Sequence, residues 1–245
     1  MDNPPNPRDM LFRLGSDLQL IKTKLSMPDS IIQIQNSKFY LPNFPEDLIQ
    51  KAIVINNNYF DSLILKTIDE YIPDNANIID AGANIGNHTL YWAVERNANH
   101  IYSFEPLDTT FQTLKRNLEL NDLTDKVTLY NVGLYNEEIN ASIETTDIKN
   151  IGHTVFKPNQ NGKFSLKTMD SYDFGDKIDL LKIDVEGAEI ELLEGAKKTI
   201  EKYRPVIVIE CFKRMFELKK FMKKHKYKLD FTLRENEDFI YIPTD

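Results

Sequence analysis

A glycine-containing segment, IIDAGANIGNHT at 78–89, holds the first residues whose types and spacing suggest chemistry. An apolar run leads into Asp80, and Gly82 and Gly86 follow directly before a helix-like stretch. Glycine has no Cβ, so the backbone of such a turn can approach a ligand closely, and unpaired N–H groups at a helix start favour an anionic group. We therefore expect this turn to bind a ligand carboxylate, with a purely architectural glycine turn as the alternative.

The spacing of these glycines separates two kinds of cofactor. A dinucleotide-binding turn has the pattern G-x-G-x-x-G, and Asn84 and Asn87 stand where its second and third glycines belong. The pattern D-x-G-x-x-x-G instead suits the methionine moiety of S-adenosylmethionine (SAM). The predicted cofactor contacts of this segment are Asp80, Gly82, Ala83, Asn84, Gly86 and Asn87.

Further cofactor contacts are predicted after the next two strand-like runs. Glu105 ends the run YSFEP and precedes Pro106, and its carboxylate can accept hydrogen bonds from both hydroxyls of a ribose. A solvated carboxylate before a helix is the alternative for this glutamate. Asn131, Val132 and Gly133 follow the third run, where backbone groups would hold the edge of an adenine.

Charged residues at the end of another apolar run mark a candidate reaction site. The segment LLKIDVEGAEIELLEGA (180–196) places Asp184 and Glu186 at the carboxyl end of a buried strand, where open α/β sheets bind their ligands. Asp184 should face this crevice, near both the cofactor and the acceptor. Capping of the following helix is the alternative for both carboxylates.

A hydroxyl acceptor would need a general base near the proton that it loses. The candidates are Asp184, His153, Glu210 and His88. His153 lies in a segment between two core strands, where an exposed loop position is the alternative, and His88 more often packs or faces solvent. Asp184 and Glu210 close neighbouring strands and would also suit Mg²⁺, so a divalent metal remains an alternative that we do not predict.

The elements that must position these residues follow from the hydrophobic pattern. Short β-branched runs alternate with helical stretches, an order typical of parallel strands joined by right-handed crossovers. Strands are expected at 77–81, 100–104, 126–132, 179–185 and 205–211, and helices at 59–72, 86–97, 108–121, 188–202 and 214–225. Two final runs, 227–233 and 238–243, flank a polar turn and predict an antiparallel hairpin. The fold class is therefore α/β, a doubly wound, mostly parallel sheet with a C-terminal antiparallel hairpin.

Residues 1–58 form a predicted N-terminal extension, and 59–245 form the predicted main domain. The extension begins with a proline-rich lead-in, and its apolar pattern predicts a helix at 10–25 and strand-like pieces in IIQIQ and KFYL. It is a candidate cover for the pocket. The segment 136–165 has little pattern, so the acceptor that it would help to bind cannot be predicted.

Composition excludes several classes of protein. A formal net charge of −8 argues against a general nucleic-acid binder. Cys211 is the single cysteine, so no intrachain disulfide can form, and the start of the chain has no secretory-signal pattern. No apolar run reaches the length of a membrane span, and we expect a cytoplasmic protein. The Lys-rich stretch 213–228 predicts a core-packed helix with a solvated face, with peripheral membrane contact as the alternative.

Four segments carry a family resemblance. DAGANIGNHTL, FEPLDTTFQTLKRNLELN, LLKIDVEGAEIELLEGA and RPVIVIE, in this order and spacing, resemble the FkbM family of methyltransferases over roughly 76–212. The resemblance implies a class I SAM-methyltransferase (Rossmann-like) fold, SAM as the methyl donor, and a hydroxyl acceptor on a sugar, a glycan or a secondary-metabolite precursor.

The resemblance also implies roles for individual residues. It assigns Asp80, Gly82, Asn84 and Gly86 to the SAM loop, Glu105 to the ribose, and Asp184 with Glu186 to the reaction crevice. The chain departs from the family at NVGLYNEE (131–138), where members commonly carry Ala and then Ser-Asp, so the adenine-side contacts are less firmly implied. Two other functions stay open: a non-catalytic SAM-binding subunit of a biosynthetic complex and a nicotinamide-dependent oxidoreductase.

Overall fold

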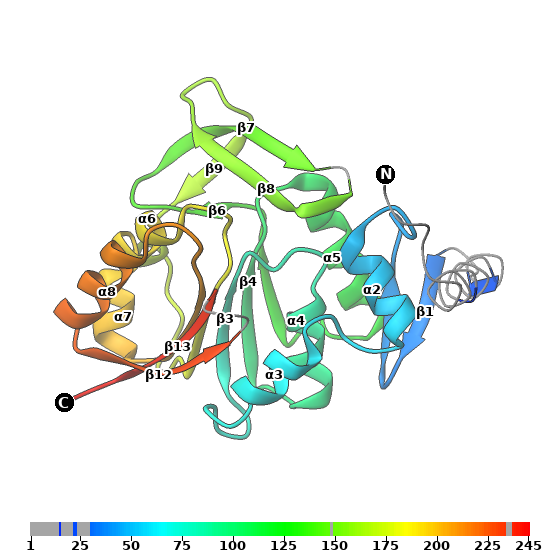
Figure 1. Cartoon of the computed structure of the whole chain (residues 1–245), viewed down its shortest axis with the longest axis horizontal. Coiled ribbons are helices and arrows are strands. Elements are labelled where there is room, and N and C mark those ends of the chain that lie inside the picture. Colours follow the sequence, from blue (N-terminus) through cyan, green and yellow to red (C-terminus); the bar gives the residue numbers. More distant parts are fainter. Residues whose placement is uncertain (1–14, 16–21, 24–29, 148, 234–236) are drawn as a thin grey trace, which may run out of the picture.

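A seven-stranded sheet forms the centre of the computed structural model, which describes residues 15, 22–23, 30–147, 149–233 and 237–245 (Figure 1). Five parallel strands are β3 (Asn77–Ala81), β4 (His100–Phe104), β5 (Val127–Tyr130), β10 (Leu180–Ile183) and β11 (Val206–Glu210). The hairpin β12 (Tyr227–Leu233) and β13 (Asp238–Pro243) adds antiparallel strands beside β11. The predicted doubly wound sheet with a C-terminal hairpin is confirmed.

The order of the strands places a ligand crevice at the middle of this sheet. The sheet runs β12–β13–β11–β10–β3–β4–β5, so the chain moves outward from β3 to β5 and then returns to β10 on the other side of β3. In open α/β sheets the crevice lies outside the carboxyl ends of the strands at such a reversal. Here the residues that follow β3 and β10 meet at this point.

Helices cover both faces of the sheet because consecutive strand residues point to opposite faces. Ile78 belongs to one hydrophobic cluster and Ile79 to the other, and Leu180 and Leu181 divide in the same way. The first face packs against α3 (Ser62–Ile68), α4 (Asn87–Leu90) and α5 (Asp108–Leu120), and the second against α6 (Glu189–Glu194), α7 (Lys197–Tyr203) and α8 (Met215–Lys224) (Figure 1). Cys211 is buried in the second cluster.

Three expected helices differ from the prediction in extent. The expected helix at 86–97 is α4 followed by a π-helical turn, Tyr91–Glu95, and the one at 59–72 is reduced to α3. The expected helix at 188–202 is two helices, α6 and α7, with Gly195 at the break. A Cβ on Gly195 would lie 2.0 Å from the carbonyl oxygen of Tyr135, so close backbone packing explains the glycine and the break.

A second sheet lies across the carboxyl edge of the first (Figure 1). It consists of β6 (Gly133–Leu134), β7 (Ile139–Asp147), β8 (Asn150–Pro158) and β9 (Phe164–Lys167), in the order β6–β9–β7–β8. A short 3₁₀ helix, Met169–Ser171, leads from it back to the main sheet. The sequence did not predict these strands, because the pairing of β7 with β8 shifts register twice and the even alternation of apolar residues is lost.

The described part of 1–58 packs on the same hydrophobic core as the main sheet. It contains the antiparallel pair β1 (Ile31–Ile34) and β2 (Ser37–Tyr40), where strand-like pieces were predicted. It also contains the helix α2 (Leu48–Asn56), which was not predicted. Phe39 and Ile53 are fully buried in the cluster that holds Ile78. The predicted division at residue 58 stays a prediction.

Several predictions fall outside the described residues. These are the lead-in at 1–9, almost all of the expected helix at 10–25, and the turn at 234–236. Where the structure does describe the chain, no helix combines the length and apolar character needed to cross a lipid bilayer.

Candidate active site

A cavity at the reversal point of the sheet is lined from both sheets and from the segment before β3. Gly82 and Asn84 contribute to it from the turn after β3, and both have positive φ angles, of 80° and 50°. A Cβ on Gly82 would lie 1.8 Å from the carbonyl oxygen of Asp184, so only glycine fits between the two strand ends. The turn therefore lies directly against the strand end at Asp184, and both Gly82 and Asn84 line the cavity.

Glu105 lies at the end of β4 and is buried, with 7% of its surface exposed. Its Oε2 accepts a hydrogen bond from the backbone N–H of Asn84 at 3.0 Å, and its Oε1 accepts one from the N–H of Leu107 at 2.8 Å. Burial raises the pKa of Glu105 to about 7, against the opposing effect of these two N–H groups. Each carboxylate oxygen retains one acceptor direction for a ligand in the cavity.

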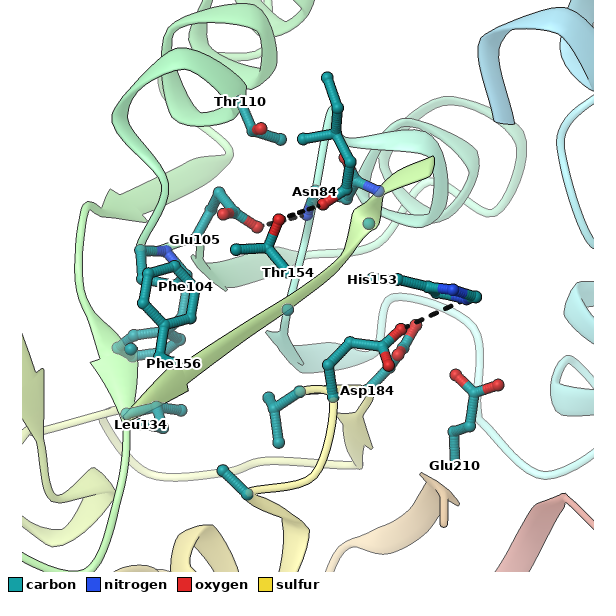
Figure 2. A pocket seen from close by; sticks show the side chains of 18 of the residues that line it. Asn84, Phe104, Glu105, Thr110, Leu134, His153, Thr154, Phe156, Asp184 and Glu210 are labelled. Carbon is teal, nitrogen blue, oxygen red and sulfur yellow. Dashed lines mark hydrogen bonds and ion pairs between the residues drawn. The ribbon is translucent and has the colours of Figure 1, made fainter. Parts of the chain in front are cut away.

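The cavity is apolar on the side beyond Glu105. Phe104, Leu134 and Phe156 lie together there, contributed by β4, β6 and β8 (Figure 2). Phe104 stacks on Tyr130 with ring centroids 4.6 Å apart, which fixes the position of its ring. This end of the cavity suits a flat, uncharged ring.

A buried lysine connects the turn after β3 with the carboxylate after β10. Lys182 Nζ donates to the carbonyl oxygen of Gly82 at 2.8 Å and forms ion pairs with Asp80 Oδ1 at 3.2 Å and Asp184 Oδ2 at 3.4 Å. Burial lowers the pKa of Lys182, but the charges of Asp80 and Asp184 outweigh burial and raise it above its usual value. The ammonium group therefore stays charged and fixes both strand ends.

The other end of the cavity is acidic. Carboxylate oxygens of Asp184, Glu186 and Glu210 lie within 4.8 Å of one another, and His153 Nε2 from β8 lies 3.7 Å from Glu186 Oε1 (Figure 2). The His153 side chain is 60% exposed, at the rim of this group. Such a set of oxygen acceptors can bind hydroxyl donors, can accept a proton, and has the ligand chemistry of a divalent cation.

The structure brings most of the predicted site residues together. Those lining the cavity are Gly82, Asn84, Glu105, Pro106, Val132, Gly133, His153, Asp184, Glu186 and Glu210. The predicted residues that do not line it are Asp80, Ala83, Gly86, Asn87 and Asn131. They lie in or beside the loops that form its wall.

The residues outside the cavity have structural contacts instead. Asp80 is fully buried and accepts a hydrogen bond from Thr89 at 2.7 Å in addition to its pair with Lys182. The Asn87 side chain bonds the backbone of Phe60 through both its oxygen and its nitrogen, each at 2.9 Å. Asn131 Nδ2 donates to the carbonyl oxygen of Glu105 at 2.9 Å. His88, the remaining candidate base, packs on Trp92 with ring centroids 5.6 Å apart.

The sequence analysis missed part of the lining. His153 was predicted as a candidate base, but the sequence did not single out Ile49, Phe60, Asp61 or Phe156. Lys182 does not line the cavity, but as a charged residue in the middle of the apolar run IDLLKIDV it is a sequence signal of the buried connection described above. A charged side chain at a buried strand position requires a partner of opposite charge. Here Lys182 indicates the connection between the ends of β3 and β10.

Comparison with known proteins identifies the family of the chain. Residues 80–232 match the family model described as the methyltransferase FkbM domain. A crystal structure of a methyltransferase FkbM from Methylobacillus flagellatus KT superimposes with a TM-score of 0.51 at 18% identity, covering 69% of this chain and 44% of that one. At that identity the likeness shows the shared class I, Rossmann-like fold.

Two curated relatives extend the comparison. Methyltransferase 1 of Beauveria bassiana is 30% identical over 149 residues, which are 50% of this chain and 59% of that protein. The hexuronic acid methyltransferase AglP of Haloferax volcanii is 26% identical over 208 residues, covering 82% of this chain and 84% of that protein. The chain thus matches about three fifths of the length of the first relative and most of the length of the second.

Proposed function

Since the chain belongs to the FkbM methyltransferase domain family, we propose that it transfers a methyl group from SAM to a hydroxyl group of a sugar, a glycan or a secondary-metabolite precursor. The observation that carries this proposal is the division of one cavity into an apolar end beside the buried Glu105 and an acidic end around Asp184. The likeness to a hexuronic acid methyltransferase supports a sugar as the acceptor.

The residues present fit SAM along the length of the cavity. The apolar residues around Phe104 would contact the adenine, and the carboxylate of Glu105 would accept hydrogen bonds from the ribose hydroxyls. The turn at Gly82 and Asn84 would hold the methionine moiety, because both residues line the cavity where the turn meets the strand end at Asp184. Asp184 belongs to the acidic end, and its backbone contact with Gly82 would bring that end next to the cofactor.

The chemistry divides between the cofactor and the protein. When bound, SAM supplies a methyl carbon on a sulfonium, which is already reactive toward a hydroxyl oxygen. The protein has to hold that oxygen in line, exclude water and accept the hydroxyl proton. We assign proton acceptance to Asp184 and positioning of the acceptor to Glu186, Glu210 and His153, which surround the acidic end.

Two binding measurements test the cofactor assignment. Titration calorimetry should show binding of S-adenosylhomocysteine and no binding of NAD, which would exclude a nicotinamide-dependent oxidoreductase. Failure of S-adenosylhomocysteine to bind would contradict the whole proposal. A transfer assay with labelled SAM and a panel of neutral hexosides, hexuronides and hydroxylated metabolites then identifies the acceptor, while binding without transfer to any of them would favour a non-catalytic subunit.

Glu105 makes cofactor binding depend on pH. Its pKa of about 7 means that the carboxyl group gains a proton as the pH falls through neutrality, and the protonated form accepts fewer hydrogen bonds from a ribose. We expect the affinity for S-adenosylhomocysteine to be constant above about pH 8 and to fall by up to about tenfold per pH unit below about pH 7. Calorimetry across this pH range measures the affinity. Glu105→Gln should bind S-adenosylhomocysteine weakly, and its affinity should not change with pH.

A chelator separates the base mechanism from the metal alternative. Asp184, Glu186 and Glu210 have the spacing of a cation site, but we propose that the reaction needs no metal. Turnover should therefore be the same before and after treatment with EDTA and gel filtration. A loss of turnover that added Mg²⁺ restores would instead assign these carboxylates to a metal ion.

A further inference from the structure

The outward face of α8 combines an aromatic residue with a row of lysines. Its inner face is buried against the sheet through Leu218, Phe221 and Met222. The residues at helical spacing on the opposite side are Phe216, Lys219, Lys220 and Lys223, all of them exposed. The Phe216 side chain is 79% exposed, which is unusual for a phenylalanine on a helix whose other face is well packed.

The same region concentrates positive charge on an acidic protein. Eight of the sixteen residues at 213–228 are Lys or Arg and one is Glu, whereas the whole chain has a net charge of −8. Arg214 pairs with Glu191 at 2.5 Å, but the lysines of the outward face project into solvent. Just before the helix, Phe212 is 49% exposed beside the exposed Lys213. The surface therefore attracts anions while the rest of the molecule repels them.

We propose that this face, defined by Phe212, Phe216, Lys219, Lys220 and Lys223, docks on an anionic lipid membrane. Lysines attract the negative surface of a bilayer, and aromatic side chains between them enter the boundary between headgroups and acyl chains. The arrangement differs from that expected for single-stranded nucleic acid, where aromatic residues stack on bases within a basic groove. Phe216 instead stands exposed on a helix.

The position of the face relative to the cavity would determine how the cavity is oriented on the membrane. Glu210 lines the acidic end of the cavity, Phe212 follows it by two residues, and Phe216 lies in the first turn of α8. The docking surface therefore begins at the same edge of the sheet as the cavity (Figure 1). This interaction goes beyond the proposed methyl transfer and does not depend on it.

Flotation with lipid vesicles tests the proposal on the full chain. The protein should float with vesicles of phosphatidylcholine and phosphatidylglycerol, should stay behind with phosphatidylcholine alone, and should release at high salt. Phe216→Ser/Lys220→Glu should reduce the bound fraction about tenfold or more, since it removes an anchor and reverses a charge. The matched control Leu63→Ser/Lys66→Glu changes an exposed apolar residue and an exposed lysine on α3 and should bind like the wild type.

Several results would overturn the docking assignment. They are equal flotation with neutral and anionic vesicles, an equal loss in the α3 control, or no flotation with either lipid. Binding of poly(U) through the same residues without vesicle binding would assign the face to nucleic acid instead. Titration with S-adenosylhomocysteine reports folding in parallel, and Lys219→Gln/Lys223→Gln, which retains Phe216, provides the test if the first variant is misfolded.

Discussion

Asp184→Asn should lower turnover by a factor on the order of 10²–10⁴ while leaving the affinity for S-adenosylhomocysteine nearly unchanged. The amide has the same shape as the carboxylate but cannot accept the proton that a hydroxyl loses. Asp184 lines the cavity, and its side chain is 31% exposed, so the substitution leaves the core intact. Initial rates with the acceptor found in the panel, together with calorimetry, measure both quantities.

A matched variant separates proton acceptance from the general negative charge of the acidic end. Glu210→Gln removes a carboxylate from the same group of three and should affect KM for the acceptor more than kcat. Normal turnover in Asp184→Asn, or an equal loss of kcat in both variants, would reject Asp184 as the base. Loss of S-adenosylhomocysteine binding in Asp184→Asn would place its role in cofactor binding instead.

Lys182→Met should be the most destabilising of the substitutions proposed. Asp80 is fully buried, and removal of the ammonium 3.2 Å away leaves its charge without compensation. Breaking a buried pair from one side typically costs about 3–5 kcal/mol in the free energy of unfolding. Urea unfolding monitored by circular dichroism measures this difference. A cost below about 1 kcal/mol would show that the pair contributes little to stability.

The double variant Asp80→Asn/Lys182→Met is the control for charge. It removes both members of the pair and retains the hydrogen bond from Thr89, so it should recover most of the stability lost in Lys182→Met. Cofactor affinity should not recover, because Lys182 Nζ also holds the carbonyl oxygen of Gly82. Recovery of stability together with full affinity would mean that the lysine does not position the turn.

The main sheet was predictable from the sequence for a physical reason. Strands buried on both faces have continuous β-branched runs, so β3, β4 and β11 were located to within one or two residues of their bounds. The predicted turn at Gly82 and the glutamate at the end of β4 line one cavity because parallel strands end at a common edge. Order along the chain was therefore enough to bring them together.

The second sheet and the depth of individual residues were not predictable. β7 and β8 have one exposed face and irregular register, so the alternation that identifies a strand is missing. Sequence position also cannot say on which side of a strand end a polar residue lies. Asp80 and Glu105 both follow apolar runs, but only Glu105 lines the cavity, and Asp80 points into the protein toward Lys182.

The contact between Gly82 and the carbonyl of Asp184 also limits how this chain can diverge. Since a Cβ at position 82 would overlap that oxygen, the proposed cofactor turn and the backbone of the proposed base cannot be altered separately. Variation in substrate range is then left to Glu210 and to His153 on the second sheet, which approach from other elements. Directed evolution toward new acceptors should accumulate changes there and leave Gly82 untouched.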